Sequence, residues 1–350
     1  HIFSCEKCGK TLKVPHSCKS RFCSSCGKKA TDNWIKNKFN TLPQTVWQHI
    51  TFTMDGKLWD FFRVNRYLLN KIPRIAANII RDLAKQQRFL PGTFLSLHTF
   101  GRDLKWNVHL HLSTTIGGLS LLNSNTWKKG AYFYHNTLKK MWKYSIITLF
   151  RKEFKAGRLK MPPALKHITT YKAFYSWTVH LYNKTWVVHL NKQSDNMKAN
   201  VEYLGKYLKR PPIGETRIKA YDGKFVTYHY LDHYTKTNMI MKLPVLEFIA
   251  RLIVHIPDKN FRSIRYYGFL ANRVVGKLLP IVHQLLKMKN IVKTKVCTTW
   301  RDMIKKTFNY DPIQCPVCNT IMKLSNIIFS SNTPIIYKHK EIANGYFPLL

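Results

Sequence analysis

The sequence predicts an α+β protein that begins with a small metal-bound module. Two local patterns and one cluster of cysteines lead to this prediction. Runs rich in β-branched and aromatic residues, which are typical of strands, are interspersed with longer amphipathic runs, which are typical of helices. The start of the chain is instead dense in cysteine, lysine and serine. It is too poor in apolar residues to form a core, so a metal must stabilise it.

The cysteine-rich start contains the segment CEKCGKTLKVPHSCKSRFCSSCG. Cys5 and Cys8 form one CxxC knuckle, and Cys23 and Cys26 form a second, so together they match a tetrahedral thiolate site for structural Zn²⁺. Three more candidate zinc ligands are surplus to these four: Cys18, His16 and His1. Either one of them replaces a knuckle cysteine, or a second ion also uses residues ahead of His1.

A third knuckle, formed by Cys315 and Cys318, lies near the other end of the chain. Its partners are left open by the sequence. Cys297 and His339 are candidate ligands, and burial of the two cysteines as small apolar residues is the alternative. Because CxxC knuckles in a chain without a secretory signal indicate bound metal in a reducing compartment, we expect a cytoplasmic protein.

The central part of the chain shows strand and helix patterns in turn. An amphipathic stretch over 57–87 predicts helix, and a hairpin is expected where two strand-like runs flank the polar segment GRDLK. The predicted strands are TVWQHITFTM, GTFLSLHTF, KWNVHLHLSTTI, SWTVHLYN, TWVVHLNK and KFVTYHYLDHY. A further helix is predicted over 195–209, where apolar residues recur at helical spacing before Arg210 and two prolines.

These patterns predict three regions. Residues 1–36 are the zinc-binding module, residues 37–235 form the central domain, and residues 236–350 form a mainly helical C-terminal region that carries the third knuckle. Since the first residue is His1 and not methionine, we expect that a start has been removed or that the chain is a fragment.

The charge of the chain indicates a polyanionic partner. Lysine and arginine total 58 against 17 acidic residues, which gives a formal net charge of +41. Nucleic acid is the expected counter-charge, and a basic surface of the ribosomal kind is the alternative. A membrane partner is not expected, because no run of about 18 apolar residues occurs.

A histidine triplet within one predicted strand suggests a second metal site. His109 and His111 lie on one face of the strand because alternate residues point the same way, while Leu110 points into the core. If the hairpin turns symmetrically, His98 lies opposite His109 and offers a third nitrogen to the same divalent ion. The alternative is that these histidines are ordinary surface or packing residues.

Two tyrosines four residues apart, Tyr203 and Tyr207, share one face of the predicted helix over 195–209. A tyrosine oxygen can attack phosphorus and so break a phosphodiester without water. Lys206, Lys209 and Arg210 are nearby and could bind a DNA phosphate, and such cations favour the phenolate form. The alternative is that both rings cover the edge of the core.

Four blocks occur along the chain in a familiar order: SCKSRFCSSCG, LHTFGRDLKWNVHLHLSTTIGGL, YLGKYLKRPPI and EFIARLIVHIPDKNFRSIRYYGFLANR. They resemble the insertion sequence ninety-one type of rolling-circle transposase, a two-tyrosine HUH enzyme, over nearly the whole chain. The resemblance implies that His109 and His111 are metal ligands, that Tyr203 and Tyr207 are the nucleophiles, and that residues 37–235 form an HUH-type central antiparallel sheet flanked by helices. It lends no support to His98.

Two positions depart from the family pattern. Val108 and Ser24 stand where proline is usual, and neither is a predicted ligand, so the chemistry is expected to survive. The family also usually has residues ahead of the knuckles, and an incomplete copy could be inactive.

The resemblance implies a metal-dependent tyrosine DNA endonuclease and strand transferase. It would nick and rejoin single-stranded DNA at insertion-sequence ends through a 5′-phosphotyrosine, using Mg²⁺ or Mn²⁺ for catalysis and Zn²⁺ for structure. Host replication machinery and a bacterial, nucleoid-associated location are expected with it. A plasmid replication initiator or relaxase of the same chemistry is one alternative, and a non-catalytic zinc-dependent DNA-binding protein is the other.

Overall fold

The computed structural model describes residues 1–15, 18, 23–39, 41–123, 125–184, 186–191, 193–195, 205, 211–232, 235–288 and 299–328. The chain folds into two compact units. The smaller contains both ends of the chain, His1–Asp32 and Lys293–Leu350, and the larger is Asn33–Val292. The region expected over 236–350 is therefore shared between the two units.

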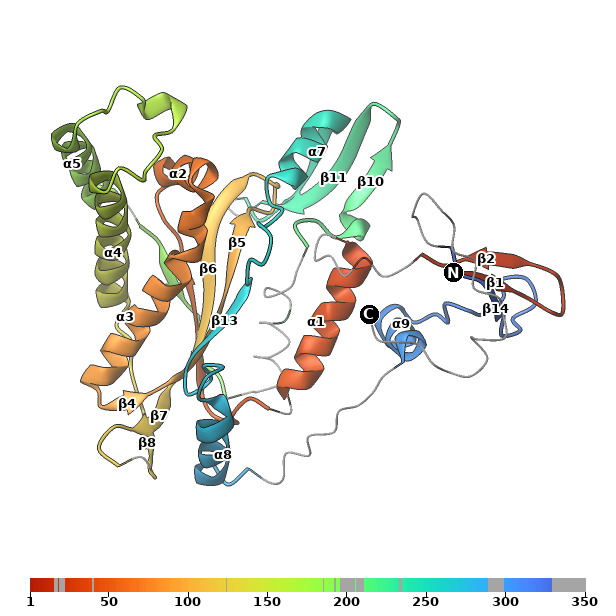
Figure 1. Ribbon diagram of the computed structural model, residues 1–350, viewed down its shortest axis with the longest axis horizontal. Coiled ribbons are helices and arrows are strands. Elements are labelled where there is room, and N and C mark those ends of the chain that lie inside the picture. The colour runs from red at the N-terminus through yellow and green to blue at the C-terminus, as the bar shows by residue number, and fades with distance from the viewer. Residues whose placement is uncertain are drawn as a thin grey trace. The chain divides into compact units, whose positions relative to one another are not determined.

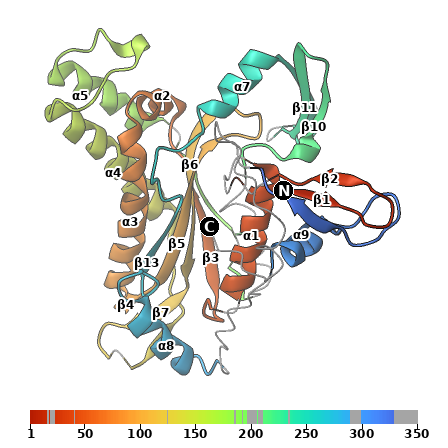
Figure 2. The same ribbon diagram turned by 45° about the vertical axis from the view of Figure 1, so that its right-hand side comes forward.

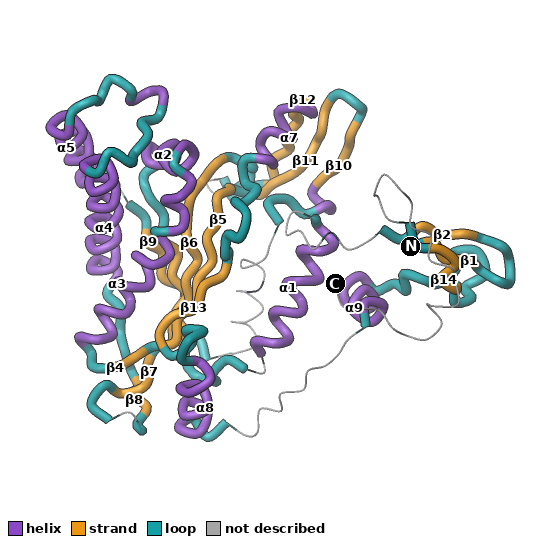
Figure 3. Tube along the Cα trace, viewed as in Figure 1, coloured by secondary structure: helices purple, strands orange, loops and turns teal. Residues whose placement is uncertain are grey.

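The larger unit is built on a five-stranded sheet with the order β13-β5-β6-β3-β9, in which every neighbouring pair is antiparallel. Figure 3 shows β5, β6, β9 and β13 of this sheet in orange. Its strands are β3 (Trp47–Phe52), β5 (Gly92–Phe100), β6 (Trp106–Thr115), β9 (Val188–Leu190) and β13 (Ile264–Gly268). The predicted hairpin is confirmed, because β5 and β6 pair along their length on either side of the GRDLK segment.

One face of this sheet is apolar and packs against helices. Alternate residues of the strands, among them Phe52, Leu97 and Leu110, are buried in the main core together with Ile80 and Trp142. The last two come from α3 (Ile72–Gln86) and α4 (His135–Lys155), which lie on the same side of the sheet in both Figure 1 and Figure 2. The amphipathic pattern over 57–87 forms this layer, with η1 (Gly56–Leu58), α2 (Trp59–Val64) and η2 (Arg66–Asn70) before α3.

The opposite face carries an aromatic cluster and is covered by α1 (Ser24–Phe39). Trp34 of α1 packs with Trp47 and Phe94 of the sheet, at ring-centroid distances of 5.8 Å from Trp34 to Phe94 and 5.4 Å from Trp47 to Phe94. The Trp34 indole Nε1–H also donates a hydrogen bond to the Tyr266 hydroxyl at 2.9 Å.

Two smaller sheets extend the larger unit. One has the order β4-β7-β8 and the other the order β10-β11-β12. Their strands are β4 (Phe89–Leu90), β7 (Gly117–Ser120), β8 (Trp127–Lys129), β10 (Ile218–Tyr221), β11 (Phe225–Leu231) and β12 (Asn238–Pro244). The other described helices of this unit are η3 (Pro163–Leu165), α5 (Tyr171–His180), η4 (Leu181–Asn183), η5 (Glu215–Arg217), α7 (Val245–Ile253) and α8 (Val275–Leu285).

Two predictions of secondary structure were wrong. The segment SWTVHLYN is not a strand, because its first half lies in α5, where the Thr170 hydroxyl caps the helix by accepting from the Ala173 amide at 3.3 Å. Phe174 and Thr178 are both buried, four residues apart, which is the periodicity of a helix and not of a strand. The segment TWVVHLNK does contain a strand, β9.

The C-terminal region is also not mainly helical. Among its described residues, β12, β13 and β14 (Lys323–Asn326) accompany α7, α8 and α9 (Trp300–Phe308). The segment IRYYG forms β13 because it completes the edge of the central sheet, where Ile264 pairs with Ser96 and Gly268 pairs with Gly92. Long-range pairing of this kind decides the conformation of β-branched and aromatic residues.

The smaller unit contains a three-stranded sheet with the order β14-β1-β2, in which β1 is Ile2–Ser4 and β2 is Thr11–Lys13. Asp311 fixes α9 by pairing with Arg301 at 2.5 Å and with Lys305 at 2.8 Å. The Lys28 ammonium lies 4.8 Å from the centroid of the Phe308 ring and bonds to the Thr307 carbonyl.

In neither unit does a described helix combine the length and the apolar character needed to cross a membrane.

Candidate active site

Three histidines gather on the face of the central sheet opposite α3 and α4. His98 of β5 pairs directly with His109 of β6, which confirms the expected register, and His111 follows on the same face two residues later. One ring nitrogen of each histidine lies within 4.8 Å of the others. The cluster therefore offers three convergent imidazole nitrogens from adjacent strands.

Neighbouring groups orient two of these rings. The Nδ1 atom of His109 lies 3.0 Å from the Asn107 carbonyl oxygen. Because a carbonyl only accepts, Nδ1 must carry the proton, and Nε2 of His109 is left with its lone pair. The His98 ring is 3% exposed and stacks on Phe100 with a centroid distance of 5.1 Å.

His111 is held by a further histidine, His49 of β3, which the sequence analysis missed. The Nε2 atom of His49 lies 3.3 Å from Nδ1 of His111, and the two rings stack with centroids 5.5 Å apart. On its other side, Nδ1 of His49 lies 3.1 Å from the Ser113 hydroxyl. The only signal for His49 was strand alternation in TVWQHITFTM, which cannot say which strand β3 pairs with.

These contacts are consistent with one chain of hydrogen bonds between neutral rings. His111 donates from Nδ1–H to Nε2 of His49, and His49 donates from Nδ1–H to the Ser113 hydroxyl. That arrangement leaves Nε2 of His111 with a lone pair. The Thr51 hydroxyl is a further neighbour of His111 Nδ1, at 3.4 Å.

Burial keeps these rings uncharged. Removal from water lowers the pKa of His111 well below 6.5, and the neighbouring imidazoles of His98, His109 and His49 lower it further. Burial also lowers the pKa of His49 to about 4, with a smaller contribution from His189. Both rings are therefore neutral near pH 7, which is the form in which imidazole binds a cation.

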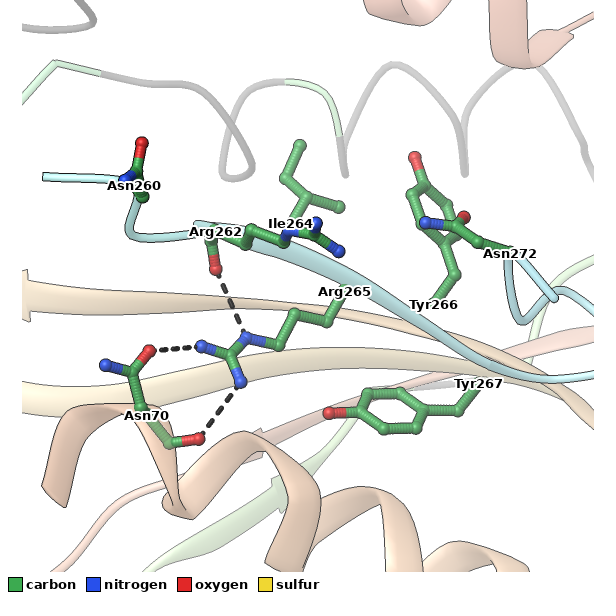
Figure 4. Close-up of a pocket in the computed structure, with 8 residues that line it drawn as sticks. All are labelled: Asn70, Asn260, Arg262, Ile264, Arg265, Tyr266, Tyr267 and Asn272. Atoms are coloured by element: carbon green, nitrogen blue, oxygen red, sulfur yellow. Dashed lines mark hydrogen bonds between the residues drawn. The ribbon is translucent and has the colours of Figure 1, made fainter. Parts of the chain in front are cut away.

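An open pocket of about 410 Å³ lies at the β13 edge of the central sheet (Figure 4). The residues that line it are Asn70, Asn260, Arg262, Ile264, Arg265, Tyr266, Tyr267 and Asn272. Ile264 pairs with Ser96 of β5, and Ser96 pairs with His111. Because neighbouring strands lie about 4.8 Å apart, this lining residue is about 10 Å from His111 along the sheet.

The two arginines of this pocket differ in their roles. The Arg265 guanidinium donates to the carbonyl and side-chain oxygens of Asn70 at 3.0 and 2.5 Å, and to the Arg262 carbonyl at 3.3 Å, so it ties β13 to η2 (Figure 4). The Arg262 side chain is exposed. Tyr266 is also engaged, through its bond to Trp34. Part of the RYYGFLANR block thus holds the sheet edge in place.

The predicted nucleophiles Tyr203 and Tyr207 and the predicted DNA-binding residues lie outside the part of the chain that the structure describes. Those DNA-binding residues are Lys206, Lys209 and Arg210. Gly205, which lies between the tyrosines in sequence, is described and buried. A Cβ atom at Gly205 would come within 2.2 Å of Cγ1 of Ile35, a residue of α1 that packs against the aromatic cluster on the histidine-bearing face. Gly205 therefore lies against the helix that covers this face.

The described cysteines form two groups that differ from the expected grouping. Cys5 and Cys8 meet the C-terminal knuckle instead of Cys23 and Cys26. In each group the sulfur atoms all lie within 4.8 Å of one another. The groups are Cys5, Cys8, Cys315 and Cys318, and Cys18, Cys23 and Cys26. The alternative ligands Cys297, His339 and His16 lie outside the described residues.

Comparisons with known proteins identify the family. Residues 92–277 match the model of a family described as putative transposase, and residues 1–54 match a transposase zinc-binding domain. The transposase for insertion sequence element IS801 of Pseudomonas savastanoi pv. phaseolicola is 38% identical over 318 residues, which cover 91% of this chain and 76% of that protein. The putative transposase y4qJ of Sinorhizobium fredii is 26% identical over 343 residues, which cover 95% of this chain and 86% of that protein.

No solved structure matches the chain. The resemblance noted from the sequence blocks and the family matches agree, and the residues matched by the putative-transposase model include all three clustered histidines. The chain belongs to the IS91 family of transposases, with an N-terminal zinc-binding domain.

Proposed function

We propose that this transposase nicks and rejoins single-stranded DNA at insertion-sequence ends, with Tyr203 and Tyr207 as the nucleophiles. The observation that carries the proposal is the cluster of His98, His109 and His111 on one face of the central sheet, within the residues that match the transposase family. Two of these residues are the HxH triplet of the sequence, and the third comes from the paired strand.

The three imidazoles fit a divalent cation. Their nitrogens converge, burial keeps His111 neutral, and the Asn107 carbonyl beside Nδ1 of His109 favours the tautomer in which Nε2 carries the lone pair. When bound, the cation would polarise the phosphate and stabilise the charge that develops on the leaving oxygen. Because imidazole suits transition ions and Mg²⁺ prefers oxygen ligands, we expect Mn²⁺ to support activity better than Mg²⁺.

His49 would act as a positioning residue for the cluster. It is buried and contacts His111, and it would fix the His111 ring by accepting from Nδ1. Partners of this kind set the tautomer and the orientation of a metal-binding histidine. Ser113 in turn orients His49 through its hydroxyl.

The tyrosines would supply the reacting oxygen. In the proposed step a tyrosine hydroxyl loses its proton to solvent, its oxygen forms a bond to phosphorus, and the bond from phosphorus to the 3′ oxygen breaks. The 3′ oxygen then takes up a proton to become a free hydroxyl, and the 5′ strand remains linked to the tyrosine. The closeness of Gly205 to Ile35 supports this proposal, because Gly205 lies between the two tyrosines in the sequence and Ile35 packs against the aromatic cluster on the histidine-bearing face.

The basic character of the chain supports single-stranded DNA as the partner. The net charge of +41 attracts a phosphate backbone, and the exposed Arg262 lies at the pocket beside the sheet edge. Lys206, Lys209 and Arg210 would contact phosphates near the tyrosines. Host replication machinery would copy the displaced strand, and the reaction would take place on nucleoid DNA in the bacterial cytoplasm.

A nicking assay tests the proposal. The full chain is incubated with Mn²⁺ and with labelled single-stranded oligonucleotides tiled across the DNA that flanks its gene. We expect a covalent protein–DNA adduct that persists in denaturing gels. Replacement of both tyrosines, Tyr203→Phe with Tyr207→Phe, should abolish the adduct and leave DNA binding intact. Binding without any adduct in the wild type would favour a non-catalytic DNA-binding protein, and an undiminished adduct in the double variant would overturn the assignment of the nucleophiles.

A further inference from the structure

We propose that Cys5, Cys8, Cys315 and Cys318 form one structural zinc site that joins the two ends of the chain. The zinc-binding family model ends at residue 54 and the transposase model ends at residue 277, so neither covers the C-terminal knuckle. The inference concerns the smaller unit alone and does not depend on the proposed cleavage chemistry.

The distances between the sulfur atoms suit a tetrahedral site. Sγ of Cys5 lies 3.3 Å from Sγ of Cys318, and Sγ of Cys8 lies 3.5 Å from that of Cys315 and 3.6 Å from that of Cys318. With Zn–S bonds of about 2.3 Å, the edges of a regular tetrahedron measure about 3.8 Å. A slight expansion would thus accommodate a zinc ion at the centre of the four sulfurs.

The two knuckles have the same backbone conformation. In the first, the Gly9 amide donates to the Cys5 carbonyl and the Cys5 amide to the Lys10 carbonyl, both at 2.9 Å. In the second, the Asn319 amide donates to the Cys315 carbonyl at 3.0 Å and the Cys315 amide to the Thr320 carbonyl at 2.8 Å.

The residue after the second cysteine is left-handed in each knuckle. Gly9 has a φ of 70° and Asn319 a φ of 58°, and glycine and asparagine are the residues that adopt this conformation most readily. The two CxxC knuckles therefore share one turn conformation, and each contributes two sulfur atoms to the cluster.

The surrounding core is too small to hold these segments together by itself. The buried members of the local cluster are Cys5, Cys315 and Met322, with Phe3 and Leu12 partly buried beside them. A sheet of three short strands, in which β1 pairs with β14, connects the knuckles. Because the free energy of zinc binding is part of the folding free energy in small domains of this kind, a bound ion would supply the stabilisation that the core lacks.

The second cysteine group would hold a separate ion. Cys18, Cys23 and Cys26 lie within 4.8 Å of one another and supply three thiolates, so a fourth ligand comes from elsewhere. The zinc-binding domain would therefore bind two zinc ions, and only one of them requires the C-terminal knuckle.

Zinc content measured by elemental analysis on the purified full chain tests the site. We expect two equivalents in the wild type and one in Cys5→Ser with Cys8→Ser. The double variant Cys315→Ser with Cys318→Ser should also retain one, and so should the variant that carries all four changes, because all four residues serve the same ion. Cys23→Ser with Cys26→Ser is the matched control: it should also leave one equivalent, and combined with the C-terminal double variant it should leave none. Unchanged zinc in the C-terminal double variant, or additive losses in the fourfold variant, would overturn the proposal.

A second measurement avoids variants that fail to fold. Cys318→His keeps a zinc-binding side chain, so cobalt substituted into this variant should give a spectrum of three sulfurs and one nitrogen at the affected site, in place of four sulfurs. In the wild type, alkylation of Cys5, Cys8, Cys315 and Cys318 should begin together as a chelator is added. Protection of the N-terminal pair while the C-terminal pair reacts freely would contradict a shared ion.

Discussion

The histidine cluster and the larger cysteine cluster are built in different ways. The histidines come from two strands of one hairpin, with His98 paired to His109 across a short turn. The four cysteines join segments at opposite ends of the chain, since Cys5 and Cys318 are 313 residues apart. A site within a hairpin follows from local pairing rules, whereas a site between chain ends depends on the whole fold. The two clusters should therefore respond independently to substitution.

The largest expected effect is the loss of DNA cleavage when the histidine cluster is changed and the cysteine clusters are left intact. His109→Ala with His111→Ala should reduce adduct formation by about 10³-fold or more, because the charge on the leaving oxygen loses its stabilisation. Zinc content should stay at the wild-type value. Nicking assays and elemental analysis on the same preparation measure both effects, and loss of zinc along with activity would show that the clusters are not independent.

The second prediction concerns pH. The pKa of His49 is about 4 in the folded chain and near 6.5 when unfolded, so the unfolded state binds more protons between these values. The free energy of unfolding should therefore be highest above pH 6.5 and fall as the pH drops toward 4, by on the order of 3 kcal/mol from this residue.

Urea denaturation in the presence of a chelator, repeated across this pH range, measures that loss. His49→Phe should show a smaller dependence on pH than the wild type, since phenylalanine does not titrate. An equal dependence in both proteins would count against a neutral, buried His49.

The third prediction concerns the positioning of His111. His49→Phe keeps an aromatic ring but removes the acceptor for His111 Nδ1, so the affinity for Mn²⁺ should fall by about 10–100-fold. Titration of Mn²⁺ by electron paramagnetic resonance measures the affinity directly. His189→Ala is the control, because His189 is exposed, pairs with Thr51 on the neighbouring strand and should affect Mn²⁺ binding much less.

The smallest expected effect is at the sheet edge. Arg262→Ala should weaken binding of single-stranded DNA about equally for all sequences. The slope of log K against log[salt] should become shallower by about the amount expected for one lost phosphate contact. Binding titrations at several salt concentrations measure this slope. Arg265→Ala is not equivalent, because Arg265 is bonded to Asn70, and its loss should instead lower the melting temperature of the larger unit.

Local pairing explains how much of the site could be predicted from the sequence. The alternation of KWNVHLHLSTTI and its short connection to GTFLSLHTF were enough to bring His98, His109 and His111 together. His49 could not be found in this way, because its contact with His111 depends on β3 pairing with β6 across 62 residues.

The same limit applies to the fold. Strands with a clear pattern of their own, such as β5, β6 and β11, were predicted, and so was β3 although its partners lie far away in the sequence. β13 was not, because its short segment IRYYG lies in a region expected to be mainly helical and is a strand through its pairing with β5. The α5 segment was assigned to a strand for a related reason. Its β-branched and aromatic residues suit either conformation, and burial of Phe174 and Thr178 decides for the helix.

The pairing of β1 with β14 has a consequence for synthesis of the protein. Cys318 is synthesised 313 residues after Cys5. At an elongation rate of about 5–20 residues per second, the first knuckle is therefore made roughly 15 to 60 seconds before the second. Translation products that stop early would never complete the site. The pairing of β1 with β14 therefore forms only in chains that have been translated at least as far as β14.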